Sequence, residues 1–229
     1  MQAYLSSMSD LLLTKHLRES GGKDEVRRVA RTITLAVLHR LDGKRKGFVL
    51  LFLAESGLID RDKAIIPLGS LGGLYGADLS GVDLSGNYRP DLDQISIAYS
   101  ILDRANLAGV YLRGSILEGS RLVGADFTGA YLQEADLVLA NLTGAKLTGA
   151  DLTDAGLINA HLTGADLTGA KLFGAYLSSA DLKDANLQGA NYNTKMMQVN
   201  LYGTSKTVVP TQWPEGFDPM SAGASCVDC

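Results

Sequence analysis

The sequence predicts a mainly β solenoid that follows a small, all-α N-terminal cap. Three observations predict this fold. Every fifth residue from position 92 to position 192 is large and apolar, and these 21 residues are Leu except for Ile97, Phe127 and Tyr192. The residue two positions before each of them is small or modest in size, most often Ala. Ahead of these units, the chain instead carries apolar residues at helical spacing.

The helical cap is expected to span residues 1–64. In residues 2–19, one helical face collects Tyr4, Leu5, Met8, Leu11 and Leu12. A second helix is expected after Asp24, which can cap it, and Gly43 is expected to end it. A third, nearly all-apolar helix is expected from about Lys44 to Ser56. Small helices of this kind can cover the open edge of a first coil.

The five-residue unit, seen plainly as Ala-Asp-Leu-Thr-Gly at residues 165–169, matches neither a continuous helix nor a continuous strand. A short extended piece followed by a turn fits it, because side chains alternate in extended chain. The Leu and the small residue then point inward, and the residue between them points outward. Thr or Ser and Gly form the turn, in which Gly supplies backbone freedom.

The pattern of a small residue, Asp or Asn, Leu, Ser or Thr, and Gly resembles the pentapeptide-repeat proteins. The resemblance implies a right-handed quadrilateral β-helix with four units per coil, expected at residues 65–202, in which residues 20 apart lie above one another. An eight-residue spacing between Leu84 and Leu92 predicts one bulging corner loop. Residues 24–59 and 211–219 resemble segments of cyanobacterial members, so a cyanobacterial type with a helical cap is expected.

Residues 203–229 are expected to form a C-terminal tail. Trp213 and Phe217 are predicted to fold over the last coil, because an exposed Trp is uncommon. Both cysteines, Cys226 and Cys229, lie in the last four residues, without a second Cys or His cluster. This spacing at a chain end favours an unstructured tail without metal.

Charge and hydropathy limit the location and the partners. The net charge of −4 combines a basic cap, with 12 Lys and Arg against 8 acids in residues 1–70, and an acidic solenoid, with 7 against 14 in residues 71–193. Neither excess is large enough to indicate nucleic acid, and none is expected as a partner. No secretory signal and no apolar span of membrane length is visible, so a cytoplasmic protein is expected.

No catalytic arrangement is visible in the sequence. The three histidines have no Cys or Ser partner in a recognisable pattern, and no phosphate-binding glycine loop occurs. The recurrent aspartates fall at the outward position of their units, where a carboxylate bonds its own turn. They are Asp126, Asp136, Asp151, Asp166 and Asp181. The sequence therefore predicts a protein that is not an enzyme and has no cofactor or metal site.

Apolar residues at outward positions are the more unusual feature. The sequence interpretation places them on two adjoining faces, as a candidate contact for an unidentified protein partner: Tyr111, Ile116, Tyr131, Val138, Leu139, Ile158, Phe173 and Tyr176. A contiguous apolar patch often marks a contact site. The other interpretation is that these residues only support the ladder of coils, as β-branched and aromatic pairs do.

Two alternatives to a protein-binding scaffold remain open from the sequence. Some pentapeptide-repeat proteins protect DNA gyrase by imitating duplex DNA, which needs a dense negative stripe. In the 20-residue columns Lys146 and Lys171 interrupt the acidic rows, which argues against DNA mimicry. The second alternative, not favoured, is a peripheral membrane scaffold. Its cap would contact anionic lipid through Arg27, Arg28, Arg31, Arg40, Lys44, Arg45 and Lys46.

Overall fold

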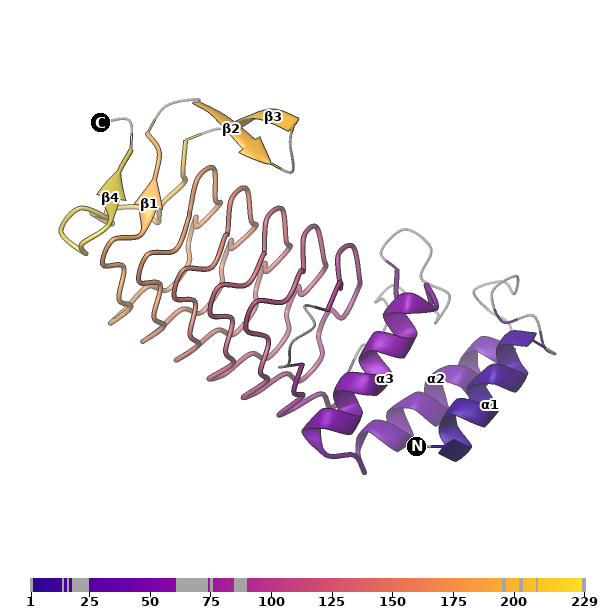
Figure 1. Cartoon of the computed structure of the whole chain (residues 1–229). Helices are drawn as coiled ribbons and strands as arrows, with labels where there is room; N and C mark the ends of the chain where they lie inside the picture. The colour runs from indigo at the N-terminus through magenta and orange to yellow at the C-terminus, as the bar shows by residue number, and fades with distance from the viewer. Residues whose placement is uncertain are drawn as a thin grey trace.

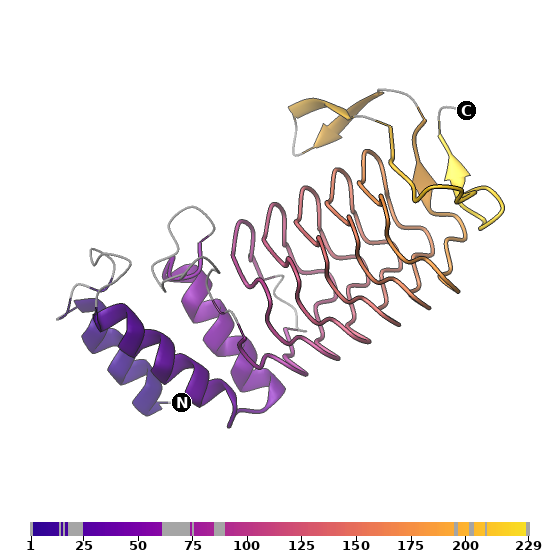
Figure 2. The same cartoon turned by 180° about the vertical axis from the view of Figure 1, so that it is seen from behind.

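The computed structural model describes residues 2–13, 15, 17, 25–60, 74, 76–84, 90–194, 197–201, 204–208 and 210–227. Figure 1 shows three helices at one end, a row of stacked coils, and a tail with short strands at the other end. Figure 2 shows the same order from behind. Asp24, residues 61–73 at the expected start of the solenoid, and residues 85–89 of the corner loop expected between Leu84 and Leu92 lie outside the described residues.

The helices are α1 (Gln2–Leu13), α2 (Glu25–Leu38) and α3 (Gly43–Glu55). In both views α3 lies between the α1–α2 pair and the coils (Figures 1 and 2). Tyr4 of α1 is buried, and its hydroxyl lies 3.2 Å from Thr34 Oγ1 of α2. Its ring also packs edge-on against Phe52 of α3, with centroids 6.4 Å apart. These contacts join the three helices into one cap.

Two glycines set how closely α3 packs on the first coil. A Cβ on Gly43 would lie 2.1 Å from Gly81 O, and a Cβ on Gly47 would lie 2.6 Å from Asp83 O. The backbone also bonds directly, since Asp83 N donates to Gly43 O at 3.0 Å. The prediction that Gly43 ends α2 is therefore wrong. The helix α2 ends at Leu38, and Gly43 begins α3, because only a residue without a side chain fits against the coil.

A buried lysine strengthens the same junction. Lys46 is 5% exposed, and its Nζ donates to Asp78 Oδ1 at 3.3 Å and to Ser80 O at 3.0 Å. Burial by itself raises the pKa of Asp78. Hydrogen bonds from the Ser80 hydroxyl and N–H, with the charge of Lys46, outweigh burial and lower that pKa to about 2. Lys46 therefore belongs to the interior and not to an exposed basic surface.

The coils repeat every 20 residues, as the resemblance to pentapeptide-repeat proteins implies. Parallel bridges join residues 20 apart without a break between Asp91 and Asn191, and each coil contributes four bridging residues. Most rungs are such single bridges and not longer strands. In the first coil the offset is 23, as in the bridge between Asp78 and Ile101. The ladder is bonded from coil to coil, for example by Leu132 N to Asp151 O at 2.8 Å.

The interior contains the Leu and Ala columns that the sequence predicts. The leucines at every fifth position from Leu92 to Leu187 are buried, and so are the alanines two positions before them except Ala185, which is partly buried. Each unit then turns, as where Ala145 N donates to Leu142 O at 2.9 Å with Gly144 at φ +63°. A positive φ at the third residue of a β-turn suits glycine. The turn glycines are therefore set by backbone geometry.

The tail closes the last coil. β1 (Asn191–Tyr192) of the last coil pairs in parallel with β4 (Ser225–Cys226) of the tail. An antiparallel hairpin of β2 (Met197–Leu201) and β3 (Thr204–Val208) lies between them in the sequence. Trp213 stacks on Phe217 and meets Tyr192 edge-on, as expected for residues folded over the last coil.

The residues around Cys226 differ from the unstructured tail that the sequence predicts. The predicted unstructured tail is wrong for residues 225 and 226, because Ser225 N donates to Ala190 O at 2.6 Å and Val227 N donates to Tyr192 O at 3.0 Å. Cys226 is disulfide-bonded. Backbone donors and acceptors at the open edge of the last coil need partners, and this part of the tail supplies them.

Candidate functional site

One face of the solenoid carries apolar side chains at outward positions. We call it the apolar face and define it by Ile116, Val138, Leu139, Ile158 and Tyr176. The bridges Ile116–Asp136, Asp136–Gly156 and Gly156–Tyr176 stack its units in that order. The structure therefore brings together the five residues that the 20-residue columns predict on this face.

The centre of the apolar face is formed by two adjacent coils. Leu139 N donates to Ile158 O at 3.0 Å, which fixes the two units side by side. A Val138 methyl carbon lies 3.6 Å from the point that a Cβ of Gly156 would occupy. Gly156 has no side chain, so nothing projects from its outward position next to Val138. Leu139 is 48% exposed and Ile158 is 36% exposed.

Leu139 has an unusual backbone for its residue type. It stands where most units have glycine, with φ +60°, and it is the only aliphatic residue among the non-glycine residues with positive φ in the described part of the chain. The left-handed conformation costs a non-glycine residue about 1 kcal/mol or more. Tyr99, at the equivalent corner, is held by its contacts: its ring lies over Gly119 and its hydroxyl donates to Glu118 Oε1 at 2.8 Å. The aliphatic side chain of Leu139 has no polar group that could form such a hydrogen bond, and it is 48% exposed.

Other segments bound the apolar face at both ends. At the cap end, Ser96 N donates to Ile59 O at 2.7 Å, and Asp60 bridges Ile95. At the tail end, Gln212 continues the column beyond Tyr176, with Leu177 N donating to Gln212 O at 2.6 Å. The face is therefore a bounded surface of the middle coils.

The remaining predicted contact residues lie beside the apolar face and not on it. Tyr111 and Tyr131 stack on the adjoining face, with centroids 4.6 Å apart and planes at 18°. Between the two faces runs a corner where Arg113 and Glu134 form an ion pair of 4.0 Å. Phe173 is half-buried at the same corner. A charged corner thus separates the tyrosines from the aliphatic residues.

Several acidic side chains of the solenoid pair with cations of neighbouring coils. Asp126 pairs with Lys146 at 3.6 Å, Asp151 with Lys171 at 3.2 Å, and Asp103 with Arg121 at 2.6 Å. Asp166 shows the second task of these carboxylates: hydrogen bonds from the hydroxyl and N–H of Thr168 lower its pKa. The outward aspartates therefore hold turns and stacked cations, and they do not form a continuous negative stripe.

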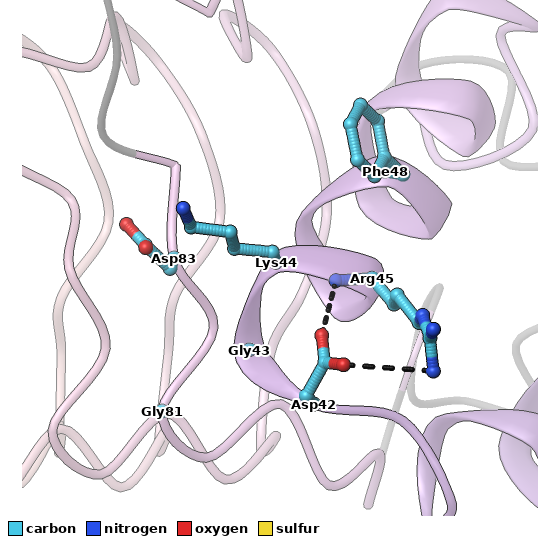
Figure 3. Close-up of a pocket in the computed structure, with 7 residues that line it drawn as sticks. All are labelled: Asp42, Gly43, Lys44, Arg45, Phe48, Gly81 and Asp83. Carbon is cyan, nitrogen blue, oxygen red and sulfur yellow. Dashed lines mark hydrogen bonds and ion pairs between the residues drawn. The ribbon is translucent and has the colours of Figure 1, made fainter.

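A second surface feature lies where α3 meets the first coil. Figure 3 shows an open pocket of about 610 Å³ at the start of α3, lined by Asp42, Gly43, Lys44, Arg45, Phe48, Gly81 and Asp83. Asp42 caps the helix by accepting from Arg45 N at 2.9 Å, and its carboxylate lies 3.6 Å from the Arg45 guanidinium. Phe48 is 66% exposed. The sequence did not single out Phe48, because Phe48 begins an apolar run that is typical of a buried helix.

The described residues contain no group of three or more His, Cys, Asp and Glu side chains that could hold a metal ion. Within that same part of the chain, no helix is long and apolar enough to cross a membrane. His39, one of the three histidines, lies 3.3 Å from Asp78 at the cap junction, and His161 is exposed at its outward position.

Comparison with known proteins gives consistent matches over the coils. The family model described as pentapeptide repeats matches residues 105–144, 120–155, 135–173 and 160–191. No curated protein matches the chain. The crystal structure of alr5209, a pentapeptide repeat protein from Nostoc Pcc 7120, is 32% identical and is matched over 55% of this chain and 84% of that chain, with a TM-score of 0.27.

Two further solved structures are similar over the repeats. HetL, a pentapeptide repeat protein involved in heterocyst differentiation regulation from the cyanobacterium Nostoc sp. strain PCC 7120, is 28% identical over 62% of this chain and 81% of that chain, with a TM-score of 0.21. Full-length QnrB1, a plasmid-mediated fluoroquinolone resistance protein, is 22% identical over 66% of this chain and 78% of that chain, with a TM-score of 0.30. No catalytic family is indicated by these matches.

Proposed function

Because the chain belongs to the pentapeptide-repeat family, we propose that it is a non-enzymatic scaffold whose right-handed quadrilateral β-helix binds another protein through the apolar face. The fold supplies a regular surface, and the function resides in the residues that depart from the repeat. The partner that fits is a protein with a complementary apolar surface, since the centre of the face offers aliphatic side chains.

The left-handed backbone of the exposed Leu139 is the single observation that supports this proposal most strongly. An aliphatic residue in the left-handed conformation is strained, and 48% exposure returns little burial energy within the monomer. Glycine at the same position avoids that cost in most other five-residue units. Strain retained by an exposed side chain is typical of a functional site. Its neighbours Val138 and Ile158 extend the same apolar surface.

DNA mimicry receives less support from the same surface. Duplex DNA carries one charge per about 1.7 Å of axis, so a mimic needs a dense row of unpaired carboxylates. Here Lys146 pairs with Asp126 and Lys171 with Asp151, each 20 residues earlier in the same column. Arg121 pairs with Asp103. A modulator of a type II topoisomerase is therefore the less supported function.

The test of the scaffold function replaces Val138→Glu together with Ile158→Glu. We expect the double variant to fold normally, because both side chains point outward, and to lose the partner that the wild type captures from an extract of its source organism. The matched control is Ala108→Glu with Thr128→Glu. These residues are exposed, occupy the same unit position 20 residues apart on another face, and follow the same backbone.

A third variant, Leu139→Gly, separates binding from folding. It relieves the positive-φ strain, so its free energy of unfolding should stay equal to that of the wild type or rise by up to about 1 kcal/mol, while partner capture weakens. Mass spectrometry of the captured proteins and urea unfolding measure the two effects. Capture of the same proteins by the wild type, the apolar-face variants and the control would contradict the proposal.

A further inference from the structure

The first turns of α3 combine an exposed aromatic ring with exposed cations. Phe48 is 66% exposed, and it lies one helical turn from Lys44 and Arg45, at i+4 and i+3. Figure 3 shows all three side chains projecting from the start of this helix. Arg40, which precedes the helix, is exposed as well. An exposed aromatic ring thus lies one helical turn from two cations.

The local charges favour an anionic occupant. Between residues 39 and 48, all of which the structure describes, the exposed cations are Arg40, Lys44 and Arg45, and the only acid is Asp42. The Asp42 carboxylate is already used by Arg45 N and the Arg45 guanidinium. Lys46 does not contribute, because Asp78 compensates it in the interior. Asp83 of the first coil lines the same pocket, so Arg40, Lys44 and Arg45 stand against Asp42 and Asp83, and an excess of one positive charge remains at the start of α3.

The charge of the whole chain gives the contact an orientation. Residues 1–70 carry 12 Lys and Arg against 8 acids, whereas residues 71–193 carry 7 against 14. A negative surface therefore attracts the cap and repels the solenoid. The start of α3 lies where the cap meets the first coil, away from the tail (Figures 1 and 2).

We propose that the start of α3 docks on an anionic lipid bilayer, with Phe48 in the headgroup region and Arg40, Lys44 and Arg45 on lipid phosphates. The apolar ring of a Phe on an interfacial helix is buried at the boundary between headgroups and acyl chains, and basic residues are attracted to anionic headgroups. A protein surface would suit Phe48 but does not require three flanking cations. This contact is independent of the apolar face, and it would leave that face open to a protein.

The experiment measures binding of the full chain to phosphatidylcholine vesicles with and without phosphatidylglycerol. We expect co-sedimentation only with phosphatidylglycerol, weakening as salt rises because the cations are screened. Changing Lys44→Gln with Arg45→Gln should weaken partitioning roughly 30-fold, since each cation contributes about 1 kcal/mol. Phe48→Ser should also weaken it, whereas Phe48→Trp should keep binding and show a blue shift of Trp fluorescence with the anionic vesicles.

Two controls establish that vesicle binding depends on the start of α3 in particular. Met220→Ser removes another exposed apolar side chain, 60% exposed but close to Asp218, and should leave vesicle binding unchanged. The apolar-face variant Val138→Glu with Ile158→Glu should also bind vesicles like the wild type, so failure of the scaffold function does not affect this result. The proposal is overturned by equal binding to both vesicle types, by no binding, or by a Phe48→Ser variant that changes only the oligomeric state in light scattering.

Discussion

At the scale of single residues, the carboxylate of Asp78 contacts three residues of the cap junction: Lys46, Ser80 and His39. Its carboxylate accepts from Lys46 Nζ and from the N–H and hydroxyl of Ser80, and it lies 3.3 Å from His39 Nδ1. Lys46 is almost fully buried, so its charge depends on this one partner. The sequence showed Lys46 only as a member of a basic run, because burial of a lysine follows from the packing of α3 on the coil.

The first prediction follows from this pair. Asp78→Asn leaves the Lys46 charge buried without a counter-charge and should lower the free energy of unfolding by about 3 kcal/mol at neutral pH. The pKa of Asp78 in the fold, about 2, lies below its ordinary value of 3.8, so its contribution is full above that ordinary value and is lost as pH falls towards 2. The stability difference between wild type and Asp78→Asn should shrink over this range in urea unfolding. A difference that stays constant with pH would contradict the ion pair, and Lys46→Met with Asp78→Asn should recover most of the stability.

At the scale of an element, tertiary packing also decides which side chains of α3 are buried. Its apolar run reads as a fully buried helix, yet only one side of it packs on the coil. Gly47 and Gly43 allow the close approach, Val49, Leu50 and Leu53 fill the interior, and Phe48 is left outside. Which side faces inward is decided by the two glycines, because any other residue would collide with the backbone of Gly81 or Asp83.

The second prediction is opposite in sign to the usual effect of replacing glycine by alanine in a helix. Gly→Ala within a helix usually stabilises by about 0.5–1 kcal/mol. Gly47→Ala should instead lower the free energy of unfolding by about 1–3 kcal/mol, because its Cβ would lie 2.6 Å from Asp83 O and 3.0 Å from a Leu84 methyl. Urea unfolding checks this value. The control Ser6→Ala, at an exposed position of α1, should leave stability unchanged or slightly raised. A Gly47→Ala variant as stable as the wild type would show that the cap can move away from the coil.

At the scale of the whole molecule, both open ends of the solenoid are closed by chain that does not follow the repeat. The cap covers the first coil through α3, and the tail supplies the rung beyond the last coil through Gln212 and β4. Thr211 fixes the tail, with its buried hydroxyl donating to Leu172 O at 2.7 Å. Nearest-neighbour stacking gives a terminal coil only one partner, so its stability depends on such a cover.

The third prediction concerns the tail. Trp213→Ala removes the ring that packs on both Tyr192 and Phe217, and it should lower the free energy of unfolding by about 2–3 kcal/mol. Hydrogen exchange should accelerate first at the N–H groups of Leu177 and Gly189, which donate to the tail residues Gln212 and Gly223. The matched change Met220→Ala, at an exposed tail residue, should alter neither measurement. Uniform exchange acceleration across all coils would mean that the tail does not protect the last coil in particular.

The five-residue period by itself determined the inward Leu and Ala positions and the outward aspartates, because these depend only on alternation in extended chain and on a fixed turn, which are local properties. The resemblance to pentapeptide-repeat proteins added four units per coil, and with it the 20-residue stacking that groups Ile116, Val138, Ile158 and Tyr176. The tertiary structure decided the burial of Lys46, the exposure of Phe48, the charged corner that separates Tyr111 and Tyr131 from the apolar face, and the rung formed by Ser225 and Cys226. These features depend on how non-repeating segments pack against coils distant in sequence, and a local pattern does not specify such contacts.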